Sequence, residues 1–131
     1  MDSLEKVRLV VNAALDKKAV DPAVFFTQEL TDLADYVVIA SGTSDRHVRA
    51  VADGIEEALG KAGEKPMGVE GASEGRWVLI DAVDVIVHIF HQPVREFYGL
   101  ERLWMDAPRL VLTPAGGIEA PQRAAEAHLR R

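Results

Sequence analysis

Two histidines, His88 and His91, stand three residues apart, a spacing that raises the question of a metal site. The segment around them has the apolar pattern of a β-strand, in which residues three apart point to opposite faces. A metal site needs convergent ligands, and no third ligand is evident nearby in the sequence. We therefore expect no metal. His88 shares a face with Ile86 and Phe90, so it should be partly buried and hydrogen-bonded.

The turn Ser41-Gly42-Thr43-Ser44 joins an expected strand to an expected helix. Free backbone N–H groups at such a helix start can hold a phosphate. The full phosphate-loop pattern, which ends in Gly-Lys followed by Ser or Thr, is absent. Turns and helix caps use Gly and Ser for structural reasons alone. Nucleotide binding at this turn is therefore an alternative hypothesis, and we expect no cofactor.

The aspartates Asp81 and Asp84 invite a two-metal interpretation. Nucleotidyltransferases place a Gly-Ser helix start before two aspartates spaced Asp-x-Asp on one strand, so that both carboxylates face the same metals. Here the spacing is Asp-x-x-Asp across an expected turn, so the carboxylates should diverge. Aspartates at hairpin turns commonly make hydrogen bonds within the turn. We expect no catalytic residues, and a nucleotide-binding enzyme of nucleotidyltransferase type stays the alternative.

The elements that would position these residues follow from the hydrophobic periodicity. It predicts three helices. The first covers residues 3–18 and is capped by Ser3, the second runs from its cap Ser44 to about Gly63, and the third covers 94–105. It predicts strands over residues 23–28, 36–40, 77–80 and 85–90, with a short strand near 67–70. Strands mixed with helices, including a β-α-β passage, indicate an α/β or α+β sheet layered with helices.

The expected hairpin of residues 77–80 and 85–90 is apolar on both of its faces. Either helices cover both faces, or part of one face is an apolar patch reserved for a partner. Three short helices could cover one face fully and the other only partly. In the third helix, helical spacing puts four residues on one side, namely Phe97, Leu100, Glu101 and Trp104.

Both tryptophans lie between residues 77 and 104, and large aromatic side chains are favoured at interface hot spots. We expect Trp77 and Tyr98 to make surface contacts, with Leu79 as a further anchor. Arg95, Glu101 and Arg102, with Tyr98, would add a polar rim, and Glu101 could pair with a basic partner. The candidate partner-binding residues are Trp77, Leu79, His88, Arg95, Tyr98 and Glu101.

Composition narrows the classes of function further. The 131 residues carry a formal charge of −6, which argues against binding to nucleic-acid phosphates mainly by electrostatic attraction. There are no cysteines, and the N-terminus lacks the pattern of a signal peptide. No segment has the apolar length that a membrane span needs. We expect a soluble cytoplasmic protein that needs no direct contact with nucleic acid.

The chain is expected to form one domain over residues 1–106, followed by a flexible tail over 107–131. The tail holds three prolines, the pair Gly116-Gly117 and no aromatic residue. A helix-forming stretch is visible within it near 120–129.

Four segments, in order, carry a resemblance to a known family: DYVVIASGTSDRHVRAVADGI, WVLID, DVIVHIF and REFYGLERLW. Together they resemble the ribosomal silencing factor (Iojap-related) family over roughly residues 3–107. The resemblance implies an α/β domain with a mixed β-sheet and flanking helices, of nucleotidyltransferase-like shape but without catalytic residues. One departure is visible, because the family usually has a glycine where this chain has Val83.

The resemblance also implies a function without catalysis. Such factors bind protein fourteen of the large ribosomal subunit, on the face that meets the small subunit, and are often homodimers. The bound factor would block subunit joining and repress translation. A dimeric scaffold that uses the apolar patch as its own interface is a further alternative.

Overall fold

The computed structural model describes residues 1–112 and 118–119. In chain order the described elements are the helix α1 (Ser3–Asp16), the strands β1 (Val20–Phe26) and β2 (Tyr36–Gly42), the helix α2 (Asp45–Lys61), the strands β3 (Gly68–Glu70), β4 (Trp77–Asp81) and β5 (Val85–His91), the helix α3 (Gln92–Tyr98), the 3-10 helix η1 (Leu100–Trp104), and the strands β6 (Arg109–Leu112) and β7 (Ile118–Glu119).

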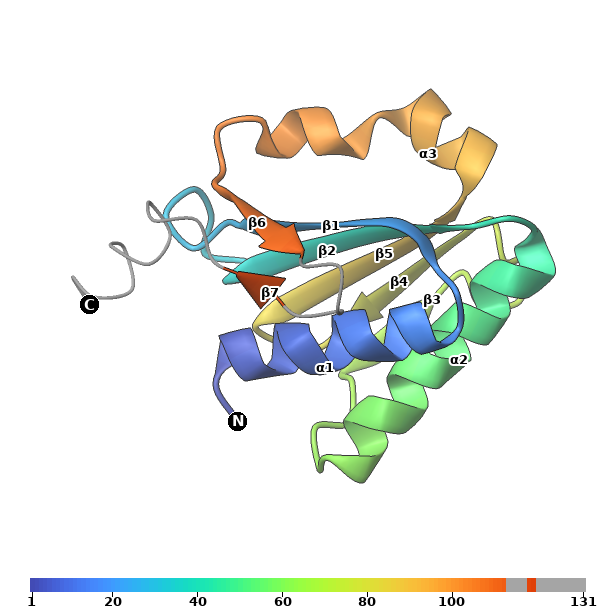
Figure 1. Cartoon of the computed structure of the whole chain (residues 1–131), viewed down its shortest axis with the longest axis horizontal. Coiled ribbons are helices and arrows are strands. Elements are labelled where there is room, and N and C mark those ends of the chain that lie inside the picture. The colour runs from blue at the N-terminus through green and yellow to red at the C-terminus, as the bar shows by residue number, and fades with distance from the viewer. Residues whose placement is uncertain (113–117, 120–131) are drawn as a thin grey trace.

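The strands form one sheet in the order β3-β4-β5-β2-β1-β6-β7. The central strands β2 and β5 are parallel, and the other neighbouring strands are antiparallel. The helices α1 and α2 lie against one face of this sheet, and α3 with η1 lies over the other (Figure 1). The prediction of an α/β fold with a mixed sheet and flanking helices is confirmed.

The two faces of the sheet are buried to different extents. Under α1 and α2, residues such as Val10, Ile55 and Ile89 belong to a large, fully buried core. The opposite face holds a smaller cluster around Ile39 and Phe90, with only partly buried residues from α3 and η1 packed against it. One face of the sheet is thus covered fully and the other only in part.

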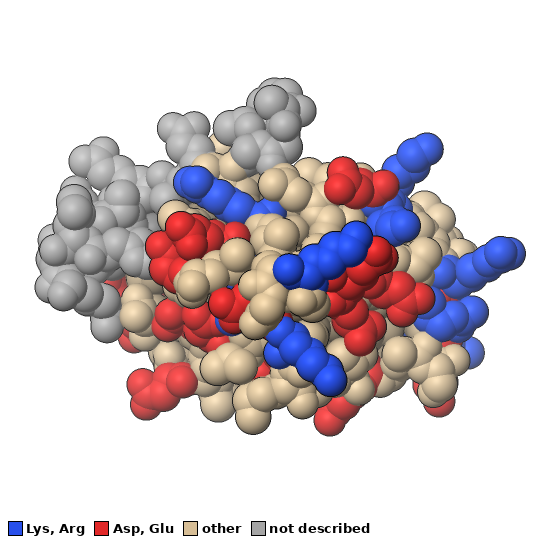
Figure 2. Space-filling view, turned by 90° about the horizontal axis from the view of Figure 1, so that it is seen from below, with Lys and Arg blue, Asp and Glu red and all other residues tan. Residues whose placement is uncertain are grey.

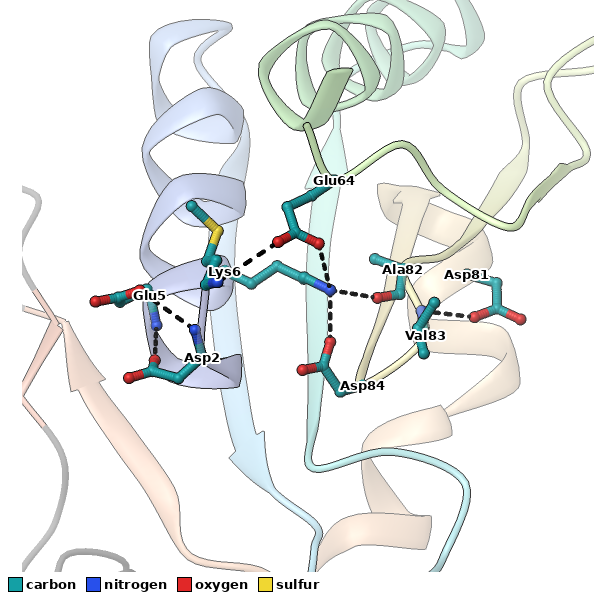
Figure 3. Close-up of polar contacts among 9 residues, drawn as sticks. Asp2, Glu5, Lys6, Glu64, Asp81, Ala82, Val83 and Asp84 are labelled. Carbon is teal, nitrogen blue, oxygen red and sulfur yellow. Dashed lines mark hydrogen bonds and ion pairs between the residues drawn. The ribbon is translucent and has the colours of Figure 1, made fainter. Parts of the chain in front are cut away.

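The N-termini of α1 and α2 are both capped by side chains. The cap of α1 is Asp2 and not Ser3 as predicted, because Asp2 and Glu5 form a complete capping box (Figure 3). The Glu5 N–H donates to Asp2 Oδ1 at 2.8 Å, and the Asp2 N–H donates to Glu5 Oε2 at 3.2 Å. Ser44 caps α2 as predicted, by accepting a hydrogen bond from the His47 N–H.

The prediction of one continuous helix over 94–105 is wrong. Gly99 has a φ of 56° and lies in the left-handed region, which ends α3. The 3-10 helix η1 then begins at Leu100. The break changes which side chains share a face, so Phe97 is exposed while Trp104 packs against the smaller cluster.

The prediction that a flexible tail begins at residue 107 is wrong for residues 107–112. β6 pairs with β1 through Leu110 opposite Val24 and Arg109 opposite Phe25, and Leu110 is buried. The rest of the expected tail, apart from 118–119, lies outside the described residues, as does the helix-forming stretch near 120–129.

The face of the molecule formed by α1 and α2 is charged. Acidic and basic side chains are interspersed across it (Figure 2). Of the large apolar side chains that are exposed in the described part of the chain, none belongs to α1 or α2. Of the helices in that same part, none combines the length and apolar character that crossing a bilayer would require.

Candidate partner-binding site on the open face of the sheet

The two aspartates of the β4–β5 turn make separate structural contacts. Asp81 Oδ1 accepts a hydrogen bond from the Val83 N–H at 2.9 Å, while Asp84 Oδ1 accepts one from Lys6 Nζ at 2.7 Å (Figure 3). Their carboxylates point apart, as the Asp-x-x-Asp spacing predicts. No group of three or more potential ligands that could hold a metal occurs among residues 1–112 and 118–119.

Lys6 is the centre of this network. Its ammonium group also donates to the Ala82 carbonyl at 2.9 Å and lies 3.4 Å from Glu64 Oε2 (Figure 3). Burial alone would lower the pKa of Lys6, but the hydrogen bond to Asp84 and the charges of Asp84 and Glu64 raise it above its usual value. The charged lysine therefore ties α1 to the hairpin turn.

The Ser41–Ser44 turn lies far from these aspartates. β2 and β5 run parallel in register, so Ser41 is level with Phe90, six residues beyond Asp84. At about 3.3 Å per residue, Asp84 lies roughly 20 Å along the strand from the level of Ser41. Asp81 is level with Ile86, which is roughly 13 Å away on the same count. The turn and the aspartates therefore do not form one compact site in this fold.

Trp77 and His88 lie on the face of the sheet that α3 and η1 cover only in part, which we call the open face. They project from the neighbouring strands β4 and β5, and Trp77 Nε1 donates a hydrogen bond to His88 Nδ1 at 3.0 Å. This bond assigns the neutral ring of His88 its proton on Nε2. Burial lowers the pKa of His88 to about 4, so the ring is neutral at physiological pH. The prediction of a partly buried, hydrogen-bonded His88 is confirmed.

Aromatic rings surround this pair. Trp77 stacks on Phe90 with centroids 4.8 Å apart and lies 5.0 Å from Tyr98, which meets Phe97 edge to face at 5.2 Å. Phe97 and Tyr98 are 82% and 56% exposed, while Trp77 is partly buried. We call the set Trp77, Leu79, His88, Phe97 and Tyr98 the aromatic face.

Next to Trp77 the surface is hollowed by a pocket of about 500 Å³. It is lined by Glu74, Arg76, Trp77, Pro93, Val94, Phe97 and Tyr98. Leu79 extends the face along β4, opposite His88, and is partly buried. The site can accept apolar or aromatic side chains from a partner, while Glu74 and Arg76 add charges at its rim.

Arg95 and Glu101 lie on the other side of α3 from this pocket. Arg95 Nε donates to Glu101 Oε1 at 2.8 Å, and its Nη1 donates to the Asp21 carbonyl and to Ser41 Oγ. The Arg95 side chain is only 11% exposed, so it anchors α3 to β1 and β2 and is not the surface rim residue predicted. The hydrogen bond from Arg95 lowers the pKa of Glu101, whose contact with a basic partner stays a prediction.

Phe97 is not among the partner-binding residues predicted from the sequence, where an unbroken helix puts it on one side with Leu100 and Trp104. The glycine at 99 was the available signal of a helix end.

His91 points to the opposite face of β5 from His88, as the strand pattern predicts. Its Nδ1 lies 3.1 Å from Asp45 Oδ1 of α2.

Comparison with known proteins decides the family. A family model described as ribosomal silencing factor during starvation matches residues 1–131. The chain belongs to the ribosomal silencing factor family. A silencing factor from Halalkalibacterium halodurans is 38% identical over 112 residues, which are 86% of this chain and 96% of the relative. These names describe a regulatory factor that acts with the ribosome.

The fold of the silencing factor is shared with a solved relative. A crystal structure of a Chromobacterium violaceum protein superposes with a TM-score of 0.78 at 38% identity, covering 79% of this chain and 87% of that one. A more distant mouse relative, named for mitochondrial assembly of the ribosomal large subunit, is 33% identical over 73 residues. That match covers 53% of this chain and 32% of the mouse protein.

Proposed function

We propose that this silencing factor binds the large ribosomal subunit through its aromatic face, with protein fourteen of that subunit as its partner. The observation that carries the proposal is the exposure of Phe97 and Tyr98 beside the partly buried Trp77, on the incompletely covered face of the sheet. Clustered, exposed aromatic side chains are typical of interface hot spots. The name of the mouse relative agrees with a partner on the large subunit.

The charge of the chain supports the same partner. The formal charge of −6 would steer the factor towards a basic ribosomal protein and away from bare RNA phosphates. A factor bound on the side of the large subunit that meets the small subunit would block subunit joining by occupying space. We expect the factor to act in the cytoplasm. We also expect no catalysis, because the candidate catalytic residues Asp81 and Asp84 make structural hydrogen bonds.

Subunit joining in vitro tests this function. Isolated large and small subunits are mixed with increasing amounts of the factor, and joining is followed by light scattering. We expect the extent of joining to fall with factor concentration when the factor meets the large subunit first. Unchanged joining in the presence of saturating, folded factor would refute the proposal.

A second copy of the chain is the alternative occupant of the aromatic face. The homodimer that we expect would compete with ribosome binding if it buried Trp77, because the same rings cannot contact both partners. Sizing the protein over a range of concentrations, with Tyr98→Ala as a comparison, tests this. A dimer that Tyr98→Ala dissociates would assign the aromatic face to self-association.

A further inference from the structure

A second cavity, of about 810 Å³, lies on the other side of α3 from the aromatic face. It falls in the size range of small-molecule sites. It is lined by residues of β1, β2, β5, α3, η1 and β6, among them Asp21, Arg95, Glu96, Glu101, Arg102 and Arg109. No residue of the aromatic face lines this cavity.

The topology of the sheet makes this position distinctive. β2 and β5 are parallel neighbours, and their carboxyl ends, at Gly42 and His91, lie level with each other. From β2 the chain passes to α2 on one face of the sheet, whereas from β5 it passes to α3 on the other face (Figure 1). In open α/β sheets, ligands bind in the crevice at the carboxyl ends of the strands where the chain reverses in this way.

Three arginines from separate elements converge on the cavity. Arg95 is held in place by Glu101, Ser41 Oγ and the Asp21 carbonyl. Arg102 and Arg109 make no ion pair with another residue of the described part of the chain. Guanidinium groups bind phosphate oxygens through paired N–H donors, so these two side chains supply an anion-binding wall.

The lining also carries acceptors. Glu101 is already paired with Arg95, so Asp21 and Glu96 are the remaining acidic residues of the lining. A bare anion would meet these two negative charges. A ligand that combines a phosphate with hydroxyl donors would use both kinds of group, since carboxylates accept hydrogen bonds from ribose hydroxyls in nucleotide sites.

We propose that this cavity binds a nucleotide, with Arg102 and Arg109 on its phosphates and the Asp21 or Glu96 carboxylate on its ribose. The role is binding without chemistry, because Asp81 and Asp84 lie beyond its reach. The helix start at Thr43 is not required, since the Thr43 N–H already donates to His47 Nδ1 at 2.9 Å. The silencing factor would thus carry a small-molecule site that is separate from its aromatic face.

Thermal unfolding of the free protein tests the proposal, without ribosomes, so that its outcome is independent of the silencing function. ATP, GTP and inorganic phosphate are each added at about 5 mM. We expect at least one nucleotide to raise the Tm by a few degrees, as a ligand of the native state does, and phosphate alone to raise it less. Equilibrium dialysis with the same nucleotide then gives its affinity.

The variants Arg102→Gln and Arg109→Gln should each weaken nucleotide binding about tenfold, since each removes a charged contact to phosphate. Arg8→Gln on α1, also exposed, is the matched control and should bind as the wild type does. Arg95 is left unchanged because it anchors α3. The proposal is overturned if neither nucleotide binds, if phosphate alone acts equally, or if the two cavity variants bind as tightly as Arg8→Gln.

Discussion

Trp77 and His88 are joined by a hydrogen bond of 3.0 Å from the indole N–H to His88 Nδ1. The indole has a single donor, and this bond satisfies it within the protein. Trp77 therefore offers a partner an apolar ring whose orientation is fixed, with no further N–H to satisfy on binding. In the proposed function, His88 would influence the partner only through Trp77, by holding the ring in place.

The first prediction concerns the pH dependence of stability. Burial lowers the pKa of His88 to about 4 from 6.5, so its contribution to folding is complete above about pH 6.5 and is lost as the pH falls towards 4. The full loss corresponds to up to about 3 kcal/mol. Denaturant unfolding of wild type and His88→Gln at pH 7 and at about pH 4.5 measures it.

Gln can accept the indole hydrogen bond but does not titrate, so His88→Gln should lose less stability than wild type between these two pH values. An equal loss in both proteins would show that His88 is not the titrating group responsible.

The second prediction concerns Val83, whose φ of 74° lies in the left-handed region. A β-branched residue is strained there, and its side chain is 57% exposed, so it contributes little packing. Val83→Gly should stabilise the fold by about 1 kcal/mol after allowing for the added entropy of the unfolded chain. Val83→Ala, which keeps the Cβ, should gain less, and equal effects of the two changes would argue against backbone strain.

The third prediction concerns Lys6, which is 5% exposed and neutralises Asp84 and Glu64. Lys6→Met should lower the free energy of unfolding by about 2–3 kcal/mol, because it leaves two partly buried carboxylates without their cation. Chemical denaturation measures the loss. The exposed neighbour Lys65 provides the control, and a loss in Lys65→Met as large as that in Lys6→Met would contradict the account.

The fourth prediction concerns Arg95, which fixes α3 to the sheet without reaching the aromatic face. Arg95→Lys keeps the charge but cannot make the same set of bonds, so α3 and its residues Phe97 and Tyr98 should become less ordered. We expect weaker binding to large subunits, by a few-fold, with a small loss of stability. Hydrogen exchange of the α3 amides should rise; if it stays unchanged while binding weakens, Arg95 contacts the partner directly.

Much of the fold could be predicted from the sequence, because burial imposes a regular pattern on the long elements. The stripe through Val48 and Ile55 marked α2, and the run from Val85 to Phe90 marked β5. The divergence of Asp81 and Asp84 followed from their spacing alone. In each case the signal was local, so neighbouring residues sufficed to predict it.

Features that depend on distant partners were missed. β6 spans only Arg109–Leu112, too short for its alternation to stand out in the sequence, and it pairs with the edge of β1, which lies more than 80 residues earlier in the chain. The anchoring role of Arg95 depends on Ser41, which is 54 residues away in the sequence. An unbroken helix would put Phe97 on the same side as Trp104, but Gly99 ends the helix and the two side chains separate.

Co-sedimentation with isolated large subunits tests the central claim most directly. Wild-type protein should pellet with the subunits, and Trp77→Ala and Tyr98→Ala should each weaken binding about tenfold or more, as loss of a hot-spot aromatic does. Tyr98 is the cleaner probe because its ring is largely exposed, and Leu33→Ala, 79% exposed in the β1–β2 loop, should bind normally. Folded wild-type protein that stays in the supernatant would contradict ribosome binding, and normal binding by both aromatic variants would contradict the site.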